Sequence, residues 1–207
     1  MSKEKILHNV ANALKRNPIP NDKGTYRDII LPVEKDKIAE YKRMQIANRA
    51  ELIECSEVEI SSRINEILKN EGLESILTPA NLSSLKLEGK VIAYDKKMEE
   101  LKDELFSTDC AVLESDYGVS NLGIICVVSS HHQPRLLSLI TKCCIVLLKK
   151  ERIMGNMSEV LGDIKEQYPQ ALPSNILFIA GPSRTADIEL QVVFGVHGPQ
   201  KTYVVLY

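Results

Sequence analysis

An α/β sandwich built on a mostly parallel sheet is the fold that this sequence favours, for three reasons. Short apolar runs with the length of buried strands recur along the chain. Amphipathic segments long enough for helices lie between most of them. The chain has 207 residues, of which 44% are hydrophobic, and this suits one domain with a single core. Strands that alternate with helices predict a parallel sheet covered on both faces.

The first part of the chain differs from the rest. Residues 2–14 have the apolar period of a helix, and Ser2 is placed to cap it. A proline-rich stretch follows, which is long for a loop inside a compact domain. We therefore predict an arm over residues 1–33 and an α/β domain over residues 34–207. The arm either packs on another subunit, which would make a homo-oligomer, or folds back on its own domain.

From residue 34 onward, helices and short strands alternate, and Gly72 is placed to end one of the helices. The middle of the chain breaks this rhythm, because three apolar pieces follow one another without room for helices. There we predict an antiparallel hairpin inserted into the sheet and turning at residues 121–123. The predicted helices are 36–47, 56–70, 96–105, 133–140 and 158–168, and the predicted strands are 51–54, 75–78, 91–94, 110–113, 118–120, 124–129, 143–148, 176–180 and 203–207.

Charge and hydropathy argue against several classes of protein. The net charge is -2 and the pI about 6.1, so no nucleic-acid partner is expected. No apolar run approaches the length of a membrane span. The N-terminus leads into an amphipathic segment instead of the apolar core of a signal peptide. We expect a cytoplasmic protein without a membrane span.

The cysteines predict buried thiols. Their number is odd and no C-x-x-C pair occurs, which argues against a disulfide framework and against an iron–sulfur cluster. The adjacent pair His131-His132 has no cysteine or glutamate nearby to complete a zinc pattern. We therefore predict no metal and no cofactor in this chain. The cysteines are Cys55, Cys110, Cys126, Cys143 and Cys144.

The stretch with the most chemical content follows the apolar run 176–180. We predict a tight turn there that opens a short helix, because Gly181 permits an unusual φ and Ser183 or Thr185 can cap exposed amides. Free amides at a helix N-terminus bind anions, and Arg184 adds a charged fork. The loop also follows the carboxyl end of a strand, where ligands gather in open α/β sheets. The segment is Gly181-Pro182-Ser183-Arg184-Thr185-Ala186-Asp187-Ile188-Glu189, and Gly195-Val196-His197-Gly198-Pro199 comes shortly after it.

Three titratable residues of these segments are candidates for catalysis. Histidine side chains exchange protons near neutral pH, so His197 suits general acid–base chemistry, or it stabilises its own glycine-flanked turn. Asp187 and Glu189 lie two positions apart and would point to different faces of a helix. They orient Arg184, cap amides or face water. No Gly-Lys-Ser/Thr follows the loop, which excludes a Walker-type phosphate loop.

Segments 181–189 and 195–199 closely resemble the C-terminal signature of the lactate-utilisation protein C family, the LUD domain, and residues 115–139 resemble it more loosely. The resemblance implies a three-layer α/β sandwich similar to the formyltetrahydrofolate cyclo-ligase and coenzyme A transferase-like (NagB/RpiA/CoA transferase-like) fold. It also implies a place in a three-protein bacterial system that oxidises L-lactate to pyruvate. Iron–sulfur clusters are then expected only in the partner proteins.

This chain differs from the family at the turn of the predicted hairpin. Relatives commonly carry E-T-G-T at the hairpin, whereas this chain has Asn121, Leu122 and Gly123 in the first three positions. Asparagine still donates and accepts hydrogen bonds, so the change puts catalysis in doubt more than ligand binding. Glu114 and Asp116 are close enough in sequence to substitute for the acid.

These observations predict a non-redox component of an L-lactate utilisation system that binds an anionic small molecule, or a partner, at the loop 181–187. Two alternatives stay open: a stand-alone cyclo-ligase-like or acyl-transfer enzyme, and a scaffold or regulator without a ligand. Arg135 matches an arginine that the family often carries. The predicted ligand-binding residues are Gly181, Pro182, Ser183, Arg184, Thr185, Arg135, Asn121, Gly123, His197 and Gly198, and the catalytic candidates are His197, Asp187 and Glu189.

Overall fold

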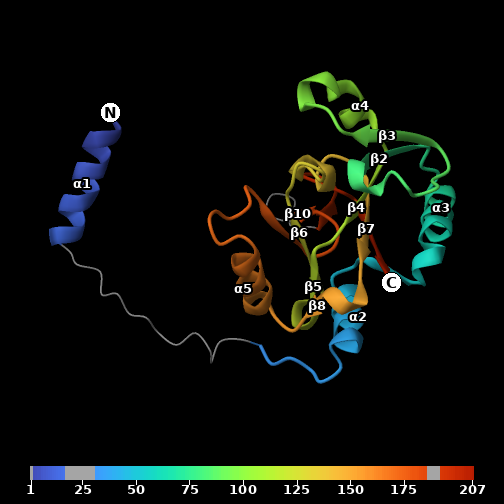
Figure 1. The fold of residues 1–207 in the computed structure, drawn as a ribbon, viewed down its shortest axis with the longest axis horizontal. Coiled ribbons are helices and arrows are strands. Elements are labelled where there is room, and N and C mark those ends of the chain that lie inside the picture. The colour runs from blue at the N-terminus through green and yellow to red at the C-terminus, as the bar shows by residue number, and fades with distance from the viewer. Residues whose placement is uncertain (1, 17–30, 186–191) are drawn as a thin grey trace. The chain divides into compact units, whose positions relative to one another are not determined.

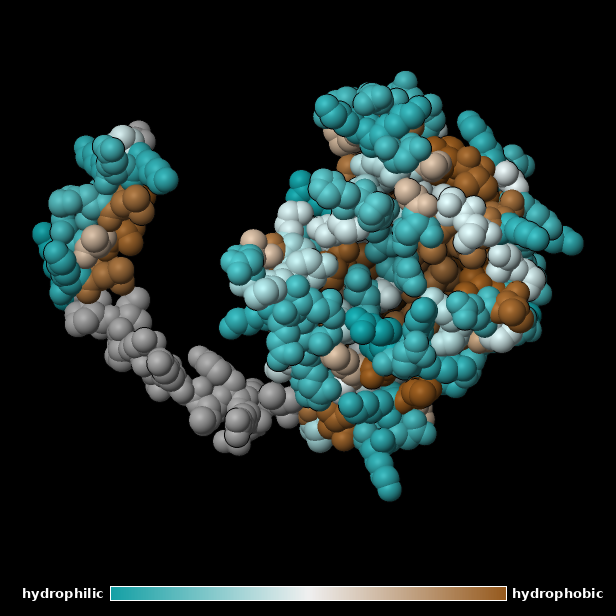
Figure 2. Space-filling model, in the orientation of Figure 1, coloured by the Kyte–Doolittle hydropathy of each residue, from teal (hydrophilic) through white to brown (hydrophobic). Residues whose placement is uncertain are grey.

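The computed structural model describes residues 2–16, 31–185 and 192–207, and it divides into an N-terminal unit and a body, Leu31–Tyr207. The N-terminal unit contains α1 (Lys3–Arg16), which confirms the helix predicted there. Its apolar side chains, among them Leu7 and Val10, gather on one side of the helix and are about half exposed (Figure 2). None of the helices in the described part of the chain has both the length and the apolar character needed to cross a membrane.

The body is built on a six-stranded sheet in which every neighbouring pair is parallel. Its order is β1-β12-β7-β4-β2-β3. Figure 1 labels four of these strands, β7, β4, β2 and β3. The α/β class with a large parallel sheet is therefore confirmed. The strands are β1 (Glu51–Glu54), β2 (Ser75–Pro79), β3 (Lys90–Tyr94), β4 (Cys110–Glu114), β7 (Cys143–Leu148) and β12 (Lys201–Leu206).

Alternate side chains of this sheet enter two different cores. On β7, Ile145 and Leu147 face one core, whereas Val146 and Leu148 face the other. The first core is closed by α3 (Ile60–Glu71), which places Ile64 and Leu68 on the sheet. The helix ends at Gly72 in the left-handed conformation, as its sequence position predicts. Both faces of the sheet are thus apolar, which explains the continuous apolar runs of its central strands.

A second, four-stranded sheet covers the other face, with order β8-β5-β6-β9. Ile125 and Val127 of β6 pack toward the large sheet, and Ile124 and Cys126 pack toward α5. The layers across this part of the body are therefore α3, large sheet, small sheet and α5. Its elements are β5 (Tyr117–Val119), β6 (Ile124–Val128), β8 (Ile153–Met154), β9 (Ile176–Ile179) and α5 (Met157–Gln167).

The small sheet corrects one prediction. The antiparallel hairpin between β5 and β6 is present, but it is not inserted into the parallel sheet. It belongs to the second sheet, where β6 also pairs with β9. The apolar pattern could not separate the two cases, because β6 is buried on both faces just as a central strand of the large sheet is.

Two predicted helices are shorter than their sequences indicate. Only α4 (Lys102–Ser107) and a preceding 3₁₀ turn form within residues 96–105. Residues 133–140 contain a single 3₁₀ helix, η6 (Arg135–Ser138), and no α-helix. The Gln133 amide side chain bonds both backbone groups of Glu114, which fixes the chain just before this turn. The predicted helix 36–47 is confirmed as α2 (Lys37–Ala47), with Asp36 as its cap.

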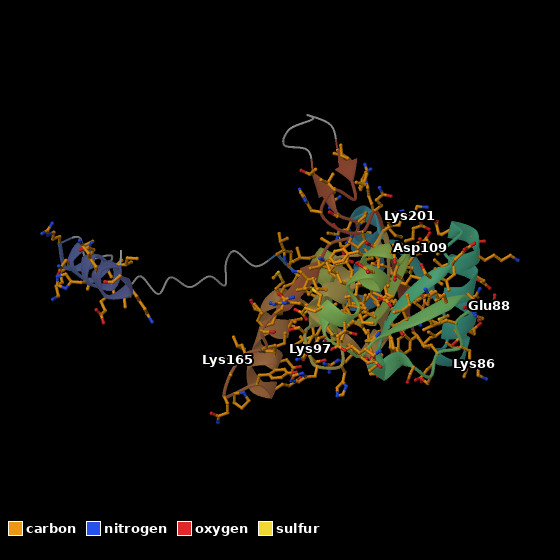
Figure 3. The ribbon with its side chains drawn as sticks, turned by 90° about the horizontal axis from the view of Figure 1, so that it is seen from above. Lys86, Glu88, Lys97, Asp109, Lys165 and Lys201 are labelled. Atoms are coloured by element: carbon orange, nitrogen blue, oxygen red, sulfur yellow. The ribbon has the colours of Figure 1, made fainter. Side chains whose placement is uncertain are left out.

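A carboxylate joins the amino ends of β2 and β4. Asp109 accepts hydrogen bonds from the Ser75 hydroxyl at 2.6 Å, from the Ser75 amide at 3.1 Å and from the Glu74 amide at 3.4 Å (Figure 3). The hydrogen bond from the Ser75 hydroxyl is the main reason that the pKa of Asp109 lies below its usual value. A charged, multiply bonded carboxylate between two strands stabilises this end of the sheet.

We predict that Asp109→Asn lowers the free energy of unfolding by about 1.5–3 kcal/mol at pH 7, because hydrogen bonds to a charged group are lost. The folded-state pKa is depressed, so the contribution is present above the unfolded value of about 3.9 and is lost as pH falls through the folded value. Urea unfolding should therefore show a smaller difference in the free energy of unfolding between the parent and Asp109→Asn at pH 3 than at pH 7. Asp95→Asn, which removes a carboxylate without a bond to any described residue, is the control. An equal difference at both pH values would contradict this account.

Candidate functional site

Both parts of the signature line one pocket of about 310 Å³. Strand β9 leads into it, and the beginnings of β7 and β12 form its floor through Cys144 and Thr202, which are paired neighbours. Segments more than ten residues apart in sequence therefore meet in space. The pocket is lined by Ser138, Leu139, Cys144, Leu177, Phe178, Ile179, Ala180, Gly181, Pro182, Ser183, Arg184, His197, Gly198, Pro199 and Thr202.

Backbone hydrogen bonds hold the two signature segments together. The Ser183 amide donates to the Pro199 carbonyl at 2.8 Å, and the Gly195 amide donates to the Ser183 carbonyl at 2.9 Å. The chain then forms two short antiparallel strands, β10 (Arg184–Thr185) and β11 (Val193–Phe194). Figure 3 shows these two strands extending outward from the body.

Residues 184–185 form β10, so a helix does not begin directly at Ser183. The rest of the segment in which the short helix was predicted lies outside the described residues. Ser183 cannot offer a free amide as the first turn of a helix would, since Pro199 already accepts from it. The Ser183 amide is therefore not available to a ligand. The segment pairs with β11 because the second half of the signature returns alongside it.

The position of the pocket corrects a second expectation. The loop does follow the carboxyl end of a strand, but that strand, β9, lies in the small sheet and runs antiparallel to β6. With respect to the parallel sheet, Cys144 and Thr202 place the pocket at the amino ends of β7 and β12. The general preference of ligands for carboxyl ends therefore gives this pocket no support.

The polar groups of the pocket are one cation, one imidazole and several hydroxyls. Arg184 and His197 are exposed, and the Arg184 guanidinium forms no hydrogen bond or ion pair with another described residue. Thr202 is buried and Ser183 is partly buried. Burial raises the pKa of the Cys144 thiol, so this group is not a nucleophile at neutral pH. The arrangement suits the binding of an anion by one charged fork and hydroxyl donors.

Gly181 is essential to the shape of this turn. Its φ is +75°, and a Cβ at this position would lie 2.2 Å from the carbonyl oxygen of Asn48. The Asn48 side chain in turn donates to the carbonyls of Leu122 and Gly123 at 2.7 and 2.8 Å. Asn48 therefore connects the signature turn with the hairpin turn.

The structure places four predicted ligand-binding residues outside the pocket. The Asn121 amide donates to the Leu31 carbonyl at 3.0 Å, and Gly123 packs against α2, where a Cβ would lie 2.3 Å from the Gln45 nitrogen. Arg135 lines a separate depression near His131. Thr185 lies in β10 and does not line the pocket. Asp187 and Glu189 lie outside the described residues, so their roles stay predictions.

Arg49 is a residue near the site that the sequence did not indicate. It has a positive φ of 64°, which is uncommon for a residue other than glycine. Its guanidinium lies 5.6 Å from the centre of the Phe194 ring, and Phe194 is the direct partner of Arg184 in β11. No local sequence pattern predicts this contact, because Arg49 and Phe194 are far apart in the sequence.

The cysteines are all free thiols, and four of the five are buried, in agreement with the prediction. Burial raises the pKa of Cys126 to about 12. Within the described ranges, no group of three or more His, Cys, Asp and Glu side chains could hold a metal ion.

We predict that Gly181→Ala lowers the free energy of unfolding by about 1–3 kcal/mol or more, because alanine is strained at positive φ and its Cβ would meet a carbonyl oxygen. The matched control is Gly162→Ala in α5, where a Cβ would meet no atom within 4 Å. This control should raise stability by about 0.5–1 kcal/mol. Thermal or urea unfolding measures both, and equal stability of the two variants would contradict the packing described here.

Several known proteins are similar to this chain in sequence. The lactate utilization protein C of Halalkalibacterium halodurans is 33% identical over 111 residues, which are 52% of this chain and only about half (48%) of the relative. The protein of that name from Shouchella clausii is 25% identical over 224 residues, which cover 99% of this chain and 97% of the relative. YkgG of Escherichia coli is 37% identical over 92 residues, 44% of this chain and 40% of the relative.

A solved structure shows the same fold. The crystal structure of a DUF162 family protein from Deinococcus radiodurans superimposes with a TM-score of 0.66 and 19% identity, covering 84% of this chain and 99% of the other. The LUD domain family matches residues 38–207, which span the large sheet, the small sheet and the pocket formed by the signature. The chain belongs to the LUD domain family.

Proposed function

We propose that this protein is a non-redox component of a cytoplasmic system that oxidises L-lactate to pyruvate, and that the signature pocket binds an anionic small molecule. Several relatives carry the name lactate utilization protein C, and one of them aligns with nearly the whole chain. Membership of the same domain family supports a common role.

One observation carries the binding part of the proposal. Residues 181–184 and 197–199 come together in one pocket and leave the Arg184 guanidinium exposed. A guanidinium grips a carboxylate with two parallel hydrogen bonds, and the Ser183 and Thr202 hydroxyls add donors. Lactate and pyruvate are both small carboxylates and suit a pocket of about 310 Å³.

Electron transfer in such a system is assigned to partner proteins that carry iron–sulfur clusters. Cluster ligands are thiolates, whereas burial raises the thiol pKa of Cys126 and Cys144 in this chain. Cys144 and Cys126 also lie in two different cores, and only Cys110 and Cys143 share a third. The chain would therefore act on the substrate, the product or the partners without itself carrying electrons.

We predict that Arg184→Ala weakens the binding of L-lactate or pyruvate about ten- to a hundredfold, which corresponds to roughly 1.5–3 kcal/mol for one charge-assisted contact. Arg184→Lys keeps the charge but loses the fork, so an intermediate loss is expected. Isothermal titration calorimetry measures the affinities. Lys165→Ala, which removes an exposed positive charge on α5 away from the pocket lining, is the control (Figure 3).

Both Arg184 variants should melt close to the parent, because an exposed arginine contributes little to the empty fold. If Arg184→Ala loses several kcal/mol of stability, the arginine stabilises the signature turn, and its role is structural and not ligand binding. In the organism that encodes the protein, a deletion strain should lose growth on L-lactate, and the parent gene should restore growth better than the Arg184→Ala gene. Normal growth of the deletion strain on L-lactate would overturn the proposed role.

A further inference from the structure

A second pocket, of about 280 Å³, lies at the opposite end of the parallel strands. The pocket is lined by residues at the carboxyl ends of three adjacent strands. These are Asn81 shortly after β2, Glu114 to Asp116 at the end of β4, and Lys149 directly after β7. This carboxyl end is where ligands bind in open α/β sheets. The lining residues used below are Asn81, Glu114, Asp116, Gln133, Lys149 and Arg152.

Arg152 is held in place by contacts that leave its outer nitrogens available. Its Nε donates to the Asp116 carbonyl at 2.9 Å, and its guanidinium carbon lies 4.3 Å from the centre of the Tyr117 ring. Tyr117 is fixed in turn, because its hydroxyl donates to Asp163 at 2.5 Å and accepts from Gln167 at 2.7 Å. The two terminal nitrogens of Arg152 form no ion pair with a carboxylate of the described residues. A guanidinium fixed in this way is preorganised to bind a carboxylate.

The carboxylates of the pocket are fixed as hydrogen-bond acceptors. Asp116 accepts from the Val128 amide at 2.7 Å, and Glu114 accepts from the Tyr207 hydroxyl at 3.3 Å. Gln133 bonds the backbone of Glu114 through both ends of its amide, at 2.9 and 2.7 Å. The pocket therefore presents positive donors and negative acceptors that are positioned before any ligand arrives.

We infer that this second pocket binds a small 2-hydroxy- or 2-aminocarboxylate. The carboxylate of such a ligand would be met by Arg152 and Lys149, and its hydroxyl or ammonium group would donate to Asp116 or Glu114. A compact polyanion such as phosphate would be repelled by the two acidic side chains, so the mixed charge selects against it. The inference is independent of the proposed function, because Arg184 does not line this pocket.

The test uses three probes of similar size: L-lactate, L-alanine and propionate, which lacks the donor group. Calorimetry or saturation-transfer NMR with the full chain should show saturable binding of L-lactate or L-alanine, whichever donor the pocket prefers, and weaker binding of propionate. Arg152→Gln should lower the affinity for the preferred probe about tenfold or more. Arg43→Gln, an exposed arginine on α2 that pairs with Glu34, is the matched control.

Lys149→Gln provides a second variant in case Arg152→Gln loosens the stack on Tyr117. The Lys149 Nζ lies 5.9 Å from the centre of the Tyr207 ring. The Arg152 amide donates to the Lys149 carbonyl at 3.0 Å, a backbone bond that Lys149→Gln keeps. Lys149→Gln should also weaken binding of the preferred probe, and an unchanged melting temperature of this variant would show that its fold is intact. Absence of saturable binding up to about 50 mM, equal affinity for propionate, or unchanged affinity in both variants would overturn the inference. Binding that is lost in Arg184→Ala but not in Arg152→Gln would assign the probe to the signature pocket instead.

Discussion

The close approach of the Gly181 turn to the backbone of Asn48 is the constraint on which the signature pocket depends. Only a residue without a Cβ can occupy position 181, at a φ of +75° and in contact with the Asn48 carbonyl. The side chain of the same residue, Asn48, donates hydrogen bonds to the Leu122 and Gly123 carbonyls of the hairpin turn. One residue at the end of α2 therefore contacts both the hairpin turn of the small sheet and the signature turn.

The layered body separates two pockets of different chemistry. The signature pocket lies at the amino ends of β7 and β12 and offers one exposed guanidinium with hydroxyl donors. The second lies at the carboxyl ends of β2, β4 and β7 and combines acids with cations. Because the two pockets lie at opposite ends of the parallel strands and share no lining residue, a ligand in one pocket does not contact the lining of the other. Variants at Arg184 and Arg152 can therefore be interpreted separately.

Most of the parallel sheet could be predicted from the sequence, because runs such as 143–148 are apolar at every position and Gly72 ends its helix as expected. The second sheet could not, since β6 is buried on both faces and has the same local pattern. The signature residues were recognised, but their conformation was not: pairing of β10 with β11 is a contact between separate segments and outweighs local capping signals. The positions of Arg49 and Arg152 could not be predicted from the sequence, because they depend on tertiary packing. Arg49 packs against Phe194, and Arg152 packs against Tyr117.

The most direct test of the central claim, that the signature forms a carboxylate pocket, is hydrogen–deuterium exchange of the full chain with and without pyruvate. Pyruvate has a carboxylate but no hydroxyl or ammonium donor, so it should favour the signature pocket over the second one. The account predicts slower amide exchange in residues 177–184 and 197–202, unchanged exchange in residues 114–116 and 149–152, and no slowing in Arg184→Ala. Unchanged exchange in the signature segments at saturating pyruvate, or equal slowing in the Arg184→Ala variant, would contradict it.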